Sequence, residues 1–187
     1  MTTLAFLGLG ALSFVLMEAV TYAVHRWVMH GPGRGLHRSH HRPPAGRLEA
    51  NDLFPVAFAS LVGVALVVGF NVPGWTWLVP VGTGVTLYGL AYGIVHDGVI
   101  HGRLPAVRKA SNPYLRSLAD AHRVHHLFGG EPYGMLAPFV PAVLTARATS
   151  ADRQPLDRRP SRGAKDHPGA SPDRPRGSAP SQVPTLP

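Results

Sequence analysis

The sequence contains no cysteine and few charged residues. Among its 187 residues there is no Cys, and Asp, Glu, Lys and Arg together make up 15%. The absence of cysteine excludes disulfide bonds, cysteine-ligated zinc fingers, iron–sulfur clusters and thiolate nucleophiles. A typical soluble domain has about 25% charged residues. The low charge content, beside 45% hydrophobic residues, therefore points away from that class, and the length is that of one ordinary domain.

Acidic residues are especially scarce, whereas histidine is abundant. The chain has 10 Asp and Glu, 18 Lys and Arg, and 11 His, with a formal net charge of +8. Since cysteine is absent and carboxylates are few, imidazole is the metal-ligating group present in quantity.

Three long apolar runs predict membrane-spanning helices. Residues 4–24 are interrupted only by Glu18, and residues 53–70 and 72–95 are uncharged. Each run is about long enough to cross the hydrocarbon core, and a turn signal between the last two predicts a hairpin. A shorter stretch at 133–144 contains two prolines and is expected to be interfacial or re-entrant. The expected fold is an all-α integral membrane protein with about three transmembrane helices.

The composition changes near residue 146. Residues 147–187 hold eight prolines and twelve charged residues and almost no large apolar side chains. Such a segment buries too little apolar surface to offset the entropy of ordering. We therefore expect a membrane-embedded domain at 1–145 and a disordered, Pro- and Arg-rich tail at 146–187.

The basic residues of the first 145 positions predict how the chain is oriented. They lie between the first and second runs and after the third run, and none lies between the second and third: Arg26, Arg34, Arg38, Arg42, Arg47, Arg103, Arg108, Lys109, Arg116 and Arg123. The positive-inside rule places that side of the membrane in the cytoplasm. Because this topology and the tail account for the net charge, no nucleic-acid partner is expected.

Ten of the 11 histidines lie in four clusters on that predicted cytoplasmic side. The pattern HxxxxH followed by HxxHH occurs twice: His25, His30, His37, His40 and His41, then His96, His101, His122, His125 and His126. Residues three and four apart share a helix face, so the histidines of each HxxHH are expected to converge. The five-residue step turns by about 140° on a regular helix. The glycine after each second histidine, Gly31 or Gly102, predicts that the helix ends or unwinds there.

Ten imidazoles are more than a single ion coordinates, so two metal ions are predicted. Imidazole binds zinc, copper, iron and nickel, and ligand type alone does not decide among them. A structural zinc ion needs fewer ligands, and the Glu-x-x-His motif of soluble di-iron bundles does not occur in the sequence. An all-histidine, two-metal site beneath a membrane surface favours O2 activation by iron on a lipophilic substrate.

The histidine boxes and their surroundings resemble the membrane fatty acid hydroxylase superfamily of non-haem di-iron oxygenases. Within it, the chain is similar to the bacterial β-carotene hydroxylases over about residues 14–140. The similar strings are Met17–Ala19, His25–Gly31, Asn51–Leu53, Tyr88–Leu90, His96–His101 and Ala121–His126. After the last box the family usually has a Gly/Ser/Phe-rich loop, where this chain has residues 129–136 instead.

The resemblance implies an O2-dependent hydroxylation at C3 of a carotenoid β-ionone ring, which would convert β-carotene through β-cryptoxanthin to zeaxanthin. It also implies that all ten box histidines hold two iron ions, that a ferredoxin-type protein donates electrons, and that the chain lies in a bacterial inner membrane. Asp97 and Asp120 are expected to orient ligand rings through hydrogen bonds. Glu18 is a third candidate because an acid within a membrane helix is costly.

Two alternative functions follow from the same residues. Another hydroxylase or desaturase of the superfamily, acting on a sterol or a fatty acyl lipid, fits the box spacing. A histidine-rich metal transporter or sensor belongs to a different class. It would place ligands along its spans, whereas the predicted spans contain no histidine.

Overall fold

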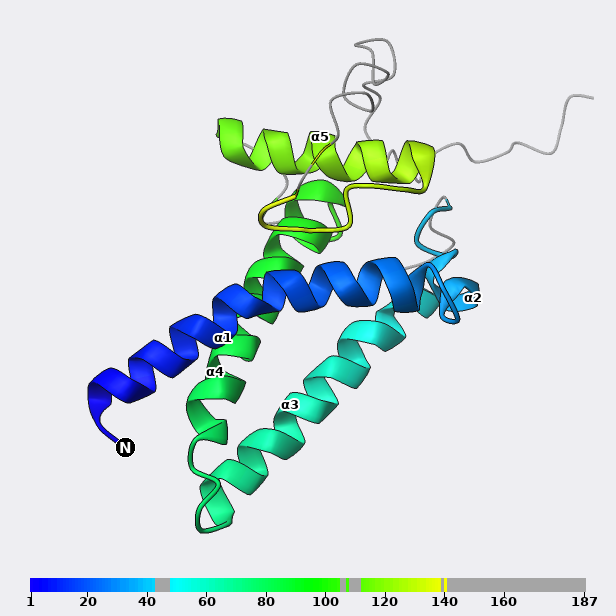
Figure 1. Ribbon diagram of the computed structural model, residues 1–187. Coiled ribbons are helices and arrows are strands. Elements are labelled where there is room, and N and C mark those ends of the chain that lie inside the picture. The colour runs from blue at the N-terminus through cyan, green and yellow to red at the C-terminus, as the bar shows by residue number, and fades with distance from the viewer. Residues whose placement is uncertain (43–47, 105–106, 108–111, 139, 141–187) are drawn as a thin grey trace, which may run out of the picture.

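The computed structural model describes residues 1–42, 48–104, 107, 112–138 and 140 (Figure 1). The described residues form helices and no strand. The helices are α1 (Thr3–Ala23), continued by a π-helical turn (Val24–Met29), α2 (Arg34–His37), a 3-10 turn (Ala50–Asp52), α3 (Leu53–Asn71), α4 (Leu78–Gly93), continued by a second π-helical turn (Ile94–Ile100), and α5 (Pro113–Phe128).

Three of these helices are long and apolar enough to cross a membrane, as the sequence predicted. They cover Thr3–Met29, Ala50–Asn71 and Leu78–Ile100. The third begins later than expected, because residues 72–77 form a turn in which Gly74 has a positive φ of 86°. The first and third extend further than expected, since each continues through its π-helical turn. They therefore include His25 and His96 at their ends.

Glycines allow α4 to pack closely between α1 and α3. A Cβ placed on Gly84 would lie 2.2 Å from the carbonyl oxygen of Gly10 in α1. A Cβ on Gly82 would lie 2.6 Å from the side chain of Leu66 in α3. Membrane helices commonly approach each other at such small residues. The α3–α4 contact confirms the predicted hairpin.

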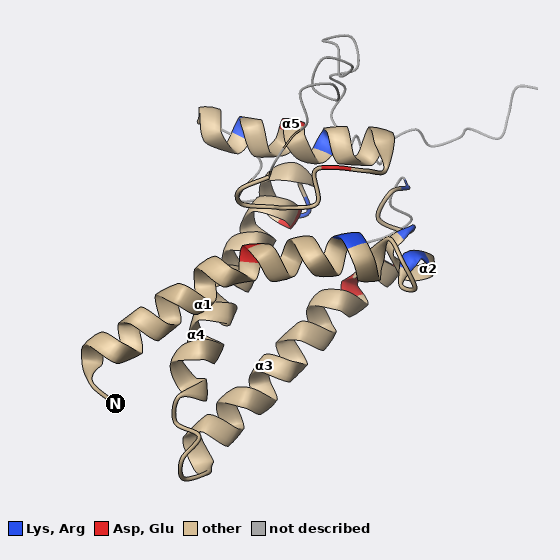
Figure 2. Ribbon diagram, in the orientation of Figure 1, with Lys and Arg blue, Asp and Glu red and all other residues tan. Residues whose placement is uncertain are grey.

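Charged residues gather toward one end of the helices. The lower parts of α1, α3 and α4, with the N-terminus and the α3–α4 turn, carry no charged side chain, and the described Arg residues lie toward the other end (Figure 2). There α5 lies across the end of α4 (Figure 1). A small core of Val95, Leu118 and Met135 holds α5 and the following loop against that end.

The two remaining predictions for the C-terminal part fall partly outside the described residues. Residues 129–138 form a loop without helix after α5, and residues 141–144 of the expected re-entrant stretch are outside the described part. The tail predicted at 146–187 also lies outside it.

Candidate metal centre

The π-helical turns explain the five-residue histidine spacing. The His30 amide donates to the His25 carbonyl oxygen at 3.0 Å, and the His101 amide donates to that of His96 at 2.9 Å. A hydrogen bond between residues five apart defines a π turn, a feature common at functional sites. It brings both rings of each pair together, with centroids 5.1 Å and 4.6 Å apart. The 140° swing of a regular helix therefore does not occur, and the helices end at the predicted positions before Gly31 and Gly102.

The HxxHH boxes converge only in part. His37 and His41 have Nε2 atoms 3.0 Å apart, and those of His122 and His126 are 2.9 Å apart. We call His25 to His41 the first arm and His96 to His126 the second arm. The middle histidine of each HxxHH box lies among histidines of the other arm. The first box is not a continuous helix, because α2 ends at His37 and a turn follows, whereas the second lies within α5.

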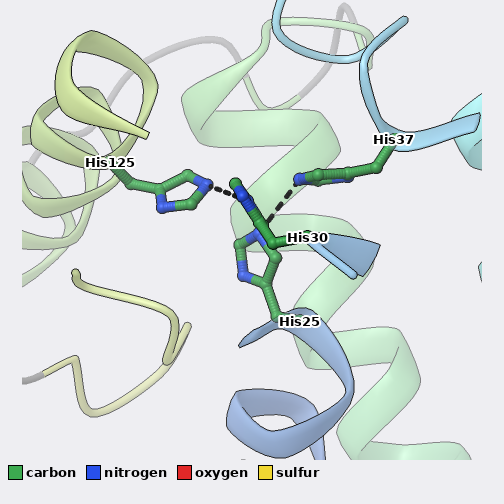
Figure 3. Close-up of side chains that lie close together, drawn as sticks. All are labelled: His25, His30, His37 and His125. Atoms are coloured by element: carbon green, nitrogen blue, oxygen red, sulfur yellow. Dashed lines mark hydrogen bonds between the residues drawn. The ribbon is translucent and has the colours of Figure 1, made fainter. Parts of the chain in front are cut away.

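One histidine group combines three residues of the first arm with one of the second. Its members, each with a ring nitrogen within 4.8 Å of the others, are His25, His30, His37 and His125. The Nε2 atoms of His30 and His125 are 3.1 Å apart, and those of His25 and His37 are 3.2 Å apart. Figure 3 shows the four rings pointing toward one another from the π-helical turn after α1, the residue that follows this turn, α2 and α5. We call these four residues the first histidine group.

A second histidine group has the reverse composition. It takes one residue from the first arm and three from the second: His40, His101, His122 and His126. The Nε2 atoms of His101 and His122 are 3.1 Å apart, and that of His40 is 3.5 Å from that of His122.

The last two box histidines lie beside these groups. The Nε2 atom of His41 is 3.0 Å from that of His37, and the Nε2 atom of His96 is 3.1 Å from that of His40. The structure thus brings all ten predicted histidines together, as two clusters of five. In every one of these contacts the facing atom is Nε2, so the donor set fits two metal ions bound through Nε2.

Neutral oxygen atoms accept hydrogen bonds from Nδ1 of three rings in the first histidine group. The Nδ1–H of His25 donates to the Tyr133 carbonyl at 3.0 Å, and that of His125 to the Gly130 carbonyl at 2.6 Å. His37 donates from Nδ1 to Oδ1 of Asn51 at 2.8 Å. A hydrogen bond at Nδ1 fixes the tautomer and leaves Nε2 free for a metal.

Carboxylates hold the His40 ring of the second histidine group and the His96 ring beside it. The Nδ1–H of His96 donates to Asp97 at 3.0 Å, and that of His40 to Glu49 at 3.3 Å. Arg103 links the acids here, since it pairs with Asp52 at 2.6 Å and with Asp97 at 3.4 Å. The two groups therefore differ in charge around them.

Burial keeps the imidazoles of His37, His41 and His125 neutral. It lowers the pKa of His37 and of His125 to about 3 and that of His41 to about 4. A neutral imidazole is the form that binds a metal.

The structure separates the three acidic residues that were predicted to support the site. Asp97 contacts the His96 ring. Asp120 is exposed on α5, and within the described part of the chain no hydrogen bond joins it to a histidine. Glu18 contacts no imidazole there; it accepts hydrogen bonds from Tyr88 and from the backbone of residues 135–137.

Several supporting residues were missed by the sequence analysis. Asn51 and Glu49 lie in the polar segment just before α3. Their position could have indicated a role, because polar residues that flank an apolar run lie at the end of the helix, where the histidines also lie. The carbonyls of Gly130 and Tyr133 gave no signal, because every residue has a carbonyl.

The chain is similar to known hydroxylases over most of its length. A family model described as fatty acid hydroxylase matches residues 10–144. A β-carotene hydroxylase of Paracoccus sp. (strain PC1) is 40% identical over 153 residues, covering 79% of this chain and 93% of the relative. One from Pseudescherichia vulneris is 40% identical over 86% of this chain and 90% of the relative.

A plant protein is also similar. β-Carotene 3-hydroxylase 2, chloroplastic, of Arabidopsis thaliana is 40% identical over 72% of this chain and 46% of the relative. The comparison with solved structures finds no match. The chain belongs to the fatty acid hydroxylase family and, within it, to the β-carotene hydroxylases.

Proposed function

We propose that this protein hydroxylates C3 of carotenoid β-ionone rings, converting β-carotene through β-cryptoxanthin to zeaxanthin, with O2 as co-substrate. The observation that carries the proposal is the pair of histidine groups at the end of three apolar helices, in a chain 40% identical to β-carotene hydroxylases. The name of the plant relative specifies the 3-position.

The residues have separate roles in this proposal. Two iron ions would be held by the first and second histidine groups, with His41 and His96 beside them. Bound iron would supply O2 activation, which side chains do not provide. Asp97 and Glu49 hold the Nδ1 proton of a ligand ring, so each keeps Nε2 directed at the metal.

The membrane placement follows from the helices and charges. We place the apolar helices in the bacterial inner membrane and the histidine end on its cytoplasmic side, because the loop arginines that the structure describes lie at that end. A carotenoid dissolved in the bilayer then reaches the histidine groups from the membrane, and a ferredoxin-type protein donates electrons from the cytoplasm.

Expression in a β-carotene-producing bacterial host tests the proposal. We expect β-cryptoxanthin and zeaxanthin in the extracted pigments, and their loss in His125→Ala, because His125 belongs to the first histidine group. Unchanged β-carotene in both strains would contradict the proposed function. Hydroxylated sterols or fatty acids in place of hydroxylated carotenoids would favour the other branch of the superfamily, and zinc transport without bound iron would favour a transporter.

A further inference from the structure

Glu18 accepts hydrogen bonds from one loop and one tyrosine. Its Oε1 accepts from the amides of Met135 at 2.7 Å and Ala137 at 2.9 Å. Its Oε2 accepts from the Leu136 amide at 3.0 Å and the Tyr88 hydroxyl at 2.6 Å. A carboxylate in a membrane helix is costly unless it is paired, and irregular backbone at that depth must have its amides satisfied. The Glu18 carboxylate and the loop amides therefore satisfy each other's hydrogen-bonding capacity.

The same loop carries the carbonyls that hold two rings of the first histidine group. Gly130 accepts from Nδ1 of His125, and Tyr133 accepts from Nδ1 of His25. The beginning of the loop is also tied to α1. There Glu131 accepts from the Tyr22 hydroxyl at 2.6 Å and pairs with Arg26 at 3.0 Å.

We propose that Glu18 is a positioning residue for the first histidine group, acting through the loop at 130–137. Glu18 fixes the position of the loop along α1, and the loop carbonyls then fix the orientation of the His25 and His125 rings. The second histidine group has its own supports, Asp97 and Glu49. Glu18 therefore supports one metal ion and not the other. This proposal rests on the proposed function, because it requires that the two groups bind metal.

Gly134 supplies an independent way to disturb the same contact. A Cβ at this position would lie 2.8 Å from Oε1 of Glu18. Gly134→Ala thus separates the loop from Oε1 of Glu18, by a shift of either one, while the carboxylate itself remains.

The test is a Co(II) titration of the metal-free, full-length protein in detergent, followed by absorbance. His30→Ala and His101→Ala provide the reference spectra of a chain that retains only the second or only the first group. In Glu18→Gln, an amide N–H faces a donor of the loop whichever way the amide turns. We expect Co(II) affinity to fall about tenfold at the first group, the lower end of the range for residues that support ligands. The Co(II) spectrum before saturation then matches that of His30→Ala.

Glu49→Gln is the matched control, since the same chemical change is made beside His40 of the second group. It should weaken Co(II) binding at the second group, so the spectrum before saturation should match that of His101→Ala. Gly134→Ala should repeat the result of Glu18→Gln. Circular dichroism verifies that each variant folds. If Glu18→Gln or Gly134→Ala fails to fold, Tyr88→Phe takes its place, because it removes one of the four hydrogen bonds to Glu18. Tyr88→Phe should weaken Co(II) binding at the first group less than Glu18→Gln does.

Two results would overturn the proposal while wild type binds two Co(II) ions: unchanged affinity in Glu18→Gln and Gly134→Ala, or equal weakening of both groups. A wild-type chain that binds no Co(II) contradicts the proposed function as well, which separates the two failures.

Discussion

His30 and His125 are 95 positions apart in the sequence, and their Nε2 atoms are 3.1 Å apart. The reverse exchange occurs at the second group, where the Nε2 atom of His40 lies 3.5 Å from that of His122. Each group is therefore completed by a histidine of the other arm, and neither arm alone forms a complete group.

The two adjacent histidines of the second HxxHH box should bind different metal ions. His125→Ala is expected to weaken metal binding at the first group, and His126→Ala at the second, because the two side chains belong to different groups. Co(II) absorbance of the two variants measures this. Identical residual spectra would contradict the crossed arrangement.

Asp97→Ala should reduce metal affinity, and Asp120→Ala should not. Asp97 accepts the Nδ1–H of His96, and loss of such a partner costs about 10–100-fold in metal affinity. Asp120 is exposed and serves as the matched control. The measurement is the Co(II) dissociation constant of the purified variants. Equal constants for the two would show that the contact between Asp97 and His96 does not affect metal affinity.

The α1–α4 contact predicts a strong effect of one methyl group. Gly84→Ala places a Cβ 2.2 Å from the Gly10 carbonyl oxygen, and overpacking of this kind costs about 1–3 kcal/mol. Gly89→Ala, in the same helix, meets nothing within 4 Å and should stabilise slightly through helix propensity. Thermal unfolding in detergent compares them. A Tm that is the same or higher in Gly84→Ala would disprove the close approach.

Acid should destabilise the metal-free protein. The pKa of His37 and His125 is about 3 in the folded chain, against about 6.5 when unfolded. Between these values the unfolded state binds more protons, so the free energy of unfolding falls as pH falls below about 6.5. Thermal unfolding from pH 7.5 to 4.5 measures the slope, and His37→Gln should make it shallower. A slope that His37→Gln leaves unchanged would contradict the assignment.

The helices and the clustering of the ten box histidines were predictable because their signals are local. An apolar run long enough to cross a bilayer indicates a spanning helix directly, and ten histidines in one repeated pattern indicate a metal site. Gly31 and Gly102 also marked where the helices end. Asp97 was found because it is adjacent to His96 in the sequence.

The arrangement of the site was not predictable from these signals. The π turns at His25 and His96 depend on backbone hydrogen bonds five residues apart, which have no composition signal of their own. The crossing of His40 and His125 depends on how the two arms pack. Glu18 was singled out as an acid within an apolar run, but its contacts were not predictable, because three of its four hydrogen-bond donors are backbone amides, which any residue of the loop would supply.

The iron content of the full chain purified from bacterial membranes tests the central claim most directly. The two histidine groups predict two iron ions per wild-type chain and one in His30→Ala and in His101→Ala, because each substitution disrupts one group. One or no iron ion in the wild-type protein, or zinc in its place, would contradict the di-iron hydroxylase proposed for this chain.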